Sequence, residues 1–234
     1  MFKLRQRKEH VKVSAVIAAG GSSVRMGFDK LTAQLCGLPV LIHTINAYEA
    51  CILIDEIIVV TREEHIPELL ADAKCQGFRK LRSIVKGGQT RQESVYAGVC
   101  ACSEDAHYIC IHDGARPLVT SAVIEAAVEA AVRHGAATAA VPAKDTIKRR
   151  HGDFVIETLP RETLMLIQTP QVFKKDLYLR AFSQCDQEYS DDCQLIENFG
   201  EPVAFSLGDY QNIKLTTEED FIMAEAFLIQ REGF

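Results

Sequence analysis

Short apolar runs alternate with amphipathic segments along the first part of the chain, and this alternation limits the fold more than any other feature of the sequence. Four runs predict strands that are buried on both faces, because they are hydrophobic along almost their whole length. They are VSAVIA, EIIVVT, YICIHD and AATAAV, at residues 13–18, 56–61, 108–113 and 136–141. Helices are predicted between them at 39–50, 90–102 and 121–134. Repetition of strand, helix and strand indicates an α/β fold, Rossmann-like, with a mostly parallel (mixed) sheet and helices on both faces.

The pattern changes after Pro142. Two short strand-like runs, KDTIKRR and FVIETL, flank HGD and predict a projecting β-arm at about 143–158. We expect helices near 174–185, 191–199 and 217–231, and a last pair of strands around VAFSL and NIKLT. Neither a linker nor an internal repeat interrupts the sequence, so we expect a single domain over residues 1–234.

Composition narrows the functional class. A net charge of −6 argues against a nucleic-acid-binding protein, which normally carries a basic excess. The eight cysteines form no C-x-x-C pair and no cluster with zinc spacing, so we interpret them as reduced. The sequence has no apolar stretch approaching about 18 residues and no apolar segment of a signal peptide, which predicts a cytoplasmic protein.

A glycine-rich segment, AAGGSSVRMGFDK, directly follows the first predicted strand. Small residues there allow backbone N–H groups to approach phosphate oxygens, and Arg25 and Lys30 supply positive charge. The spelling fits neither a Walker loop nor the G-x-G-x-x-G of dinucleotide-binding folds. We therefore predict phosphate binding here, the alternative being a plain strand-to-helix turn. The predicted nucleotide-binding residues of this segment are Ala18, Ala19, Gly20, Gly21, Ser22 and Ser23.

IHDGARP ends the third predicted strand, and the carboxyl ends of strands are where open α/β sheets bind ligands. A carboxylate in this place suits magnesium, which takes oxygen ligands and substrate phosphates. We predict that Asp113 holds the ion. The structural alternative is that Asp113 caps a turn and pairs with Arg116.

Several segments resemble known sequences. The glycine-rich segment is similar to the A-A-G-x-G-x-R-M-G signature of nucleotidyltransferases. In order along the chain, GGQTRQESVYAGV, IHDGARP, AKDTIKR, TPQVF and NIKLTTEED resemble motifs of the 2-C-methyl-D-erythritol 4-phosphate cytidylyltransferase family. These enzymes transfer CMP from CTP to the sugar-alcohol phosphate and release pyrophosphate. Together the motifs extend over residues 13–220.

The resemblance also implies roles for individual residues. Arg25 and Lys30 match cations that stabilise the transition state, and Arg161 and Lys214 match catalytic cations that also bind the acceptor phosphate. Gly88, Gln89 and Ser94 match the segment that recognises cytidine, and Arg116 and Thr146 match acceptor-binding residues. The family also implies magnesium as the cofactor and a homodimer in which Thr146 and Arg161 serve the partner's site.

Three other functions stay open at this point. A ribitol-5-phosphate cytidylyltransferase shares the glycine-rich loop and a similar H-D-x-x-R-P motif. A molybdopterin-type nucleotidyltransferase that uses GTP is suggested by GGSSVRMGFDK, which has four residues between Gly20 and Arg25. A non-catalytic nucleotide-binding regulator would keep the fold without needing Arg25, Lys30, Asp113, Arg161 and Lys214 together.

Overall fold

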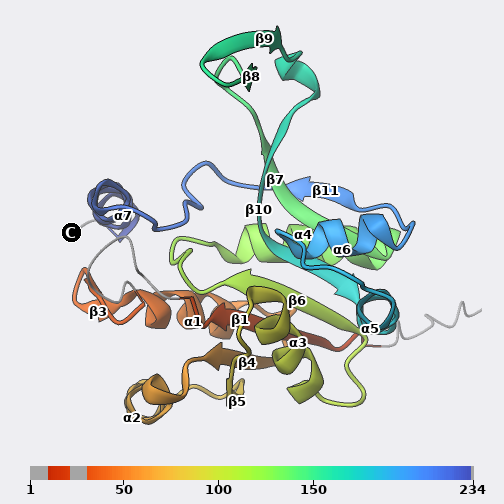
Figure 1. Ribbon diagram of the computed structural model, residues 1–234. Coiled ribbons are helices and arrows are strands. Elements are labelled where there is room, and N and C mark those ends of the chain that lie inside the picture. Colours follow the sequence, from red (N-terminus) through yellow and green to blue (C-terminus); the bar gives the residue numbers. More distant parts are fainter. Residues whose placement is uncertain (1–9, 22–30, 233–234) are drawn as a thin grey trace, which may run out of the picture.

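A seven-stranded sheet runs through the computed structural model, which describes residues 10–21 and 31–232. The strands lie in the order β11-β7-β10-β6-β1-β4-β5 (Figure 1). Their bounds are Val13–Ala19 (β1), Glu56–Thr61 (β4), Leu81–Lys86 (β5), Tyr108–Asp113 (β6), Ala136–Pro142 (β7), Met165–Lys174 (β10) and Ala204–Leu207 (β11). β1 pairs in parallel with β4 and β6, β4 with β5, and β7 with β11, whereas β10 is antiparallel to both β6 and β7. The predicted mixed, mostly parallel sheet is confirmed.

Helices cover both faces of this sheet, as predicted. The helices are Val40–Ala50 (α1), Ile66–Gln76 (α2), Arg91–Ala101 (α3), Ser121–His134 (α4), Lys175–Ser183 (α5), Asp192–Asn198 (α6) and Glu218–Glu232 (α7). Side chains of α1 and α4 pack in one apolar cluster with β1, and those of α3, α5 and α6 pack in a second cluster that also contains Val16 of β1. In the part of the chain that the structure describes, no helix is long and apolar enough to cross a membrane.

α3 illustrates how local sequence places a helix. Thr90 caps it, and Glu93 completes a capping box with the backbone N–H of Thr90. Midway along the helix, a Cβ added at Gly98 would lie 2.5 Å from Val16 and 2.6 Å from Val60. Glycine at this position therefore lets α3 pack directly on β1 and β4, and the start of the helix is fixed at the edge of the sheet.

The predicted arm is present as a hairpin of Lys148–His151 (β8) and Phe154–Thr158 (β9), which projects beyond the far ends of β7 and β10 (Figure 1). A second small hairpin joins Gln34–Leu35 (β2) to Leu38–Pro39 (β3), and two short 3₁₀ turns lie at Glu63–His65 and Arg161–Thr163. Pro39 directly precedes α1 rather than opening it.

One predicted strand is wrong. VAFSL contains β11, but NIKLT, at residues 212–216, forms neither strand nor helix. Its backbone bonds go to separate partners: Leu215 N–H donates to the carbonyl of Ala115 at 2.8 Å, and Asn212 N–H donates to Asp209 at 2.9 Å. The alternating apolar side chains of this segment reflect burial within a loop, since Leu215 packs in a cluster with α7.

Candidate active site

The sheet reverses its strand order beside β1. From β1 the chain continues to β4 and β5 on one side and then crosses to β6 on the other. All four strands run parallel, so their carboxyl ends meet at the same edge. Open α/β sheets bind ligands at such a switch point, outside the carboxyl ends of the strands.

A cavity of about 480 Å³ lies at this edge, within the size range of small-molecule sites. Eight of the residues predicted from sequence line it: Ala18, Gly20, Gly21, Gly88, Gln89, Ser94, Asp113 and Lys214. Leu31, Arg62, Thr90, Arg91 and Ala115 complete the wall among the described residues. The predicted glycine-rich segment, the predicted cytidine-recognition segment and Asp113 are therefore brought together.

Close backbone packing explains the glycines between β5 and α3. A Cβ added at Gly87 would lie 2.7 Å from Oγ of Ser94, and one at Gly88 would lie 2.4 Å from Cβ of Glu93. The Glu93 carboxylate accepts from the backbone N–H of Gln89 at 2.7 Å. These contacts hold Gly88 and Gln89 against the first turn of α3, in the wall of the cavity.

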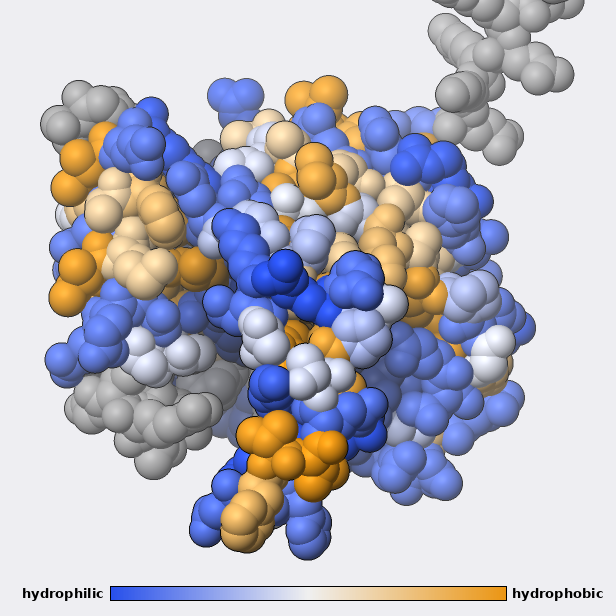
Figure 2. Space-filling view, turned by 90° about the horizontal axis from the view of Figure 1, so that it is seen from above, coloured by the Kyte–Doolittle hydropathy of each residue, from blue (hydrophilic) through white to orange (hydrophobic). Residues whose placement is uncertain are grey.

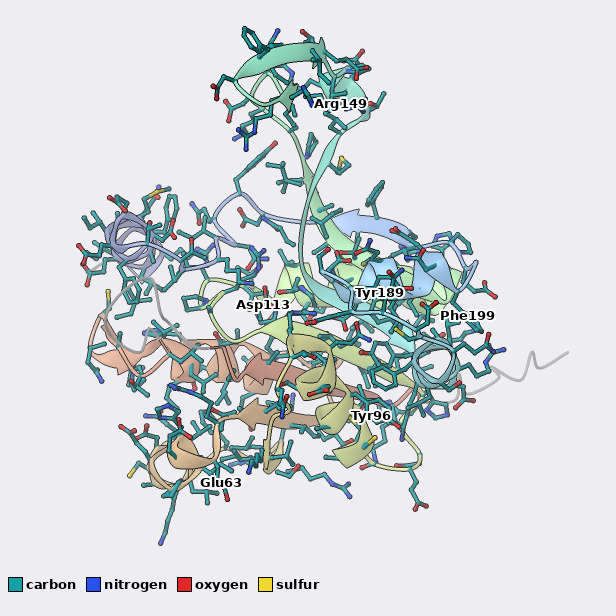
Figure 3. The ribbon with its side chains drawn as sticks, in the orientation of Figure 1. Glu63, Tyr96, Asp113, Arg149, Tyr189 and Phe199 are labelled. Carbon is teal, nitrogen blue, oxygen red and sulfur yellow. The ribbon has the colours of Figure 1, made fainter. Side chains whose placement is uncertain are left out.

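Asp113 ends β6 with its carboxylate nearly buried (Figure 3). Lys214 Nζ lies 2.9 Å from Oδ2, and the Nε atoms of Arg91 and Arg116 lie 3.6 Å from Oδ1 and Oδ2. Burial alone would raise the pKa of Asp113, but these three cations hold it well below its ordinary value. The carboxylate is therefore ionised at neutral pH. The contact with Arg116 that defined the structural alternative is present, together with the cavity-facing position that the metal prediction requires.

The loop before α7 carries Lys214 to this carboxylate. Asn212 is fully buried, and its Nδ2 donates to the carbonyl of Thr169 at 2.8 Å. Its own carbonyl accepts from Nη1 of Arg116 at 2.7 Å. The loop is thus bonded both to β10 and to the turn after β6, which places Lys214 within reach of Asp113.

His112 is adjacent in sequence but has a structural role. Its Nε2 lies 3.2 Å from the carbonyl of Arg116, and a carbonyl can only accept, so Nε2 carries the proton. Nδ1 then accepts from the Thr169 hydroxyl at 3.0 Å. Complete burial lowers the pKa of His112 to about 3. The ring is neutral at physiological pH, and its two bonds fix the turn that contains Arg116.

The remaining predicted residues lie apart from the cavity or outside the described residues. Ala19 is buried in β1, and its carbonyl accepts from the Thr61 hydroxyl at 3.2 Å. Thr146 and Arg161 are exposed near the base of the arm, where Arg161 donates to the carbonyl of Lys144 at 2.6 Å. Ser22, Ser23, Arg25 and Lys30 lie outside the described residues.

Sequence reasoning missed three charged residues at the site, one of which is Arg62, which directly follows β4 and lines the cavity. Arg91 lines the cavity, and its Nη1 lies 2.7 Å from Oδ2 of the buried Asp192 at the start of α6. Arg91 is the arginine of the G-G-x-x-R motif, so the motif itself could have identified it. Asp192 belongs to no motif that we recognised, and only the fold places it beside Arg91.

Known proteins resemble this chain over almost its whole length. The family model described as 2-C-methyl-D-erythritol 4-phosphate cytidylyltransferase matches residues 13–230. Proteins of that name from Pelotomaculum thermopropionicum and Halalkalibacterium halodurans are 44% and 43% identical to this chain, with 95% of this chain covered in each case and 96% and 99% of the relatives. The crystal structure of 4-diphosphocytidyl-2C-methyl-D-erythritol synthase from Anaerococcus prevotii aligns with a TM-score of 0.84 at 31% identity, over 94% of this chain and 99% of that one. The chain therefore belongs to the 2-C-methyl-D-erythritol 4-phosphate cytidylyltransferase family.

Proposed function

We propose that the cavity beside Asp113 is where this chain transfers CMP from CTP to 2-C-methyl-D-erythritol 4-phosphate. An oxygen of the acceptor phosphate attacks the α-phosphorus of CTP, and the bond to the β-phosphate breaks to release pyrophosphate. The observation that carries the proposal is the junction of the Gly20–Gly21 loop, the Gly88–Gln89 segment and Asp113 in one cavity. These are the places that the family resemblance gives to the triphosphate, the base and the metal.

The residues at this junction fit magnesium. Asp113 offers one ionised carboxylate in the cavity wall, and magnesium is usually held by one or two carboxylates together with substrate phosphates and water. Asp113 would therefore hold an ion that arrives with the triphosphate. The ion would draw the phosphate oxygens together and neutralise charge that develops on them. Lys214, at 2.9 Å from Asp113, is then free to turn toward an anionic substrate.

Such a reaction needs no general base. A phosphate monoester is already ionised at neutral pH, so the barrier comes from repulsion between anions and from charge that grows on pyrophosphate. Positive groups fixed in advance lower that barrier. Arg91, Arg116 and Lys214 surround Asp113 and supply such groups, and we assign Arg25 and Lys30 to the α-phosphate by family resemblance. The neutral His112 takes no part in proton transfer.

The acceptor site is proposed to include a second copy of the chain. Phe154, Val155 and Ile156 on β9 are 78%, 63% and 58% exposed, which is costly for apolar side chains on a two-stranded hairpin. Figure 2 looks down on the side from which the arm projects. On this side, hydrophobic residues form separate patches with hydrophilic surface between them. We propose that the arm packs on a partner and brings Thr146 and Arg161 to the partner's site.

A cytoplasmic location also remains a prediction.

A pyrophosphate-release assay tests the function directly. CTP or GTP is combined with methylerythritol 4-phosphate or ribitol 5-phosphate in the presence of magnesium. We expect the highest kcat/KM with CTP and methylerythritol 4-phosphate. Faster turnover with ribitol 5-phosphate or with GTP would overturn the substrate assignment. The same assay after chelation with EDTA, and after magnesium is restored, tests the requirement for the ion.

A further inference from the structure

Arg91 lies between two carboxylates at the start of α3. Its Nη1 is 2.7 Å from Oδ2 of Asp192, whereas its Nε is 3.6 Å from Oδ1 of Asp113. The guanidinium therefore forms its close ion pair with Asp192 and only a longer contact with Asp113. Arg91 also lines the cavity, so it faces the space that we assign to CTP.

Asp192 is held rigidly from other directions. Its side chain is 2% exposed, and the Tyr178 hydroxyl donates to its Oδ1 at 3.0 Å. Its backbone N–H donates to Oε1 of Gln171, a buried residue of β10 that lies opposite Ile111 of β6 in the sheet register. Tyr178 of α5 thus holds the carboxylate and Gln171 of β10 holds the backbone, so Asp192 is fixed by contacts other than its pair with Arg91.

We propose that Asp192 is a positioning residue for nucleotide binding: it holds Arg91 in the cavity wall and prevents it from closing onto Asp113. This inference rests on the proposed function, since it takes the cavity to be the CTP site. A bidentate pair between Arg91 and Asp113 would occupy the carboxylate that we assign to the metal and would remove the guanidinium from the triphosphate. The pair with Asp192 keeps the Arg91 guanidinium in the cavity wall and at the longer distance of 3.6 Å from Asp113.

Charge alone predicts the opposite effect of removing Asp192. The described charged residues that line the cavity are Arg62, Arg91, Asp113 and Lys214, and Arg116 and Asp192 pair with two of them. These six groups sum to about +2 when all are ionised, and Asp192→Asn raises the sum to about +3. A more positive site should bind an anionic nucleotide more tightly. If Asp192 acts by positioning Arg91, the same substitution should bind CTP more weakly.

The two explanations are separated by calorimetric titration of CTP, with excess magnesium and no acceptor, into the purified full-length protein. We expect Asp192→Asn to raise the Kd for CTP roughly tenfold or more, the effect of losing a hydrogen bond between charged groups. Glu197→Gln is the matched control. It removes the same negative charge from the same helix, at an exposed residue. Its Kd should stay within about twofold of the wild-type value.

A double-mutant cycle identifies Arg91 as the group through which Asp192 acts. Arg91→Gln and Asp192→Asn combined should weaken CTP binding no more than the stronger single substitution, because both remove the same positioned guanidinium. Thermal melting shows whether Asp192→Asn is folded. If it is not, Arg91→Lys decides the question, since an ammonium group keeps the charge but not the fork that reaches both carboxylates.

The inference is overturned if folded Asp192→Asn binds CTP as tightly as wild type or more tightly, or if Glu197→Gln weakens binding equally. It is also overturned if the two losses add in the cycle, or if Arg91→Lys leaves the Kd unchanged. Failure of the proposed function gives a different result, because the wild-type protein would then neither bind CTP nor release pyrophosphate from it.

Discussion

Asp113→Asn removes the carboxylate that Lys214, Arg91 and Arg116 share, and its effects on stability and on activity should separate. Distance alone does not set the size of the stability effect. Lys12 lies 2.7 Å from Asp105, closer than the 2.9 Å between Lys214 and Asp113. The size of the stability effect depends on burial: the side chain of Asp105 is 73% exposed, whereas that of Asp113 is 11% exposed.

The expected loss of stability in Asp113→Asn depends on which partners the three cations retain. Breaking a buried ion pair typically costs about 3 to 5 kcal/mol. Here the cost is smaller, because Arg91 retains Asp192, Arg116 retains the carbonyl of Asn212, and Lys214 is 40% exposed and can turn to water. We expect a loss of about 2 kcal/mol, the cost of an unpartnered buried group, and a fall in Tm of roughly 4 to 8 °C. Asp105→Asn, the matched surface control, should leave Tm close to the wild-type value.

Acid should reduce this stability difference. The folded pKa of Asp113 lies below its ordinary value, so the carboxylate stabilises the protein fully above the unfolded pKa of about 3.9. That contribution is lost as pH falls toward the folded pKa. The gap in Tm between wild type and Asp113→Asn should therefore be full at neutral pH and begin to narrow only below about pH 4. A gap that narrows between pH 7 and pH 5 would contradict the depressed pKa.

Activity should fall much further than stability. Loss of a preorganised electrostatic group typically costs about 3 kcal/mol of transition-state stabilisation, or roughly a hundredfold in rate. Pyrophosphate release by Asp113→Asn, measured with CTP saturating and well below Tm, should show at least that loss. Wild-type rates in the folded variant would return Asp113 to its structural alternative, a partner for Arg116 without a metal.

Three further predictions concern separate parts of the chain. Lys30→Ala should chiefly lower kcat and Lys214→Ala should chiefly raise the acceptor KM, as steady-state kinetics with CTP saturating will show; the same pattern in both would make the role assignment wrong. Gly88→Ala should weaken CTP binding in calorimetry, because its Cβ would lie 2.4 Å from Cβ of Glu93; unchanged affinity would mean that this backbone can shift freely. Phe154→Asp should dissociate the proposed dimer, which light scattering at micromolar concentration tests, and a monomeric wild type would refute the dimer itself.

Elements with strong local signals could be predicted from the sequence. The helix predicted at 121–134 is α4, which begins after Thr120 and ends before Gly135. The threonine side chain accepts from Val123 N–H, and the glycine has a positive φ of 94°. α2 was not predicted, although its apolar periodicity is stronger than that of α3, and Pro67 and Gly77 are ordinary signals for the start and end of a helix. β5 has a weaker signal, because it is an edge strand and none of its six residues is fully buried.

The residues of the site also differ in whether local sequence signals specify their positions. Residues at the ends of predicted strands could be predicted, because parallel strands bring their carboxyl ends to one edge whatever their order, and Gly20 and Asp113 follow from this rule. Gly88 follows β5, which was not predicted, and only the family resemblance indicated it. The pair of Arg91 and Asp192 could not be predicted, because the two residues are 101 positions apart and meet only when β10 inserts antiparallel beside β6 and carries α5 and α6 to the start of α3. No periodicity in the sequence specifies that insertion. The residues that we propose to bind substrate thus lie in local motifs, whereas Asp192, which we propose to position Arg91, is identified only when the strand order is known.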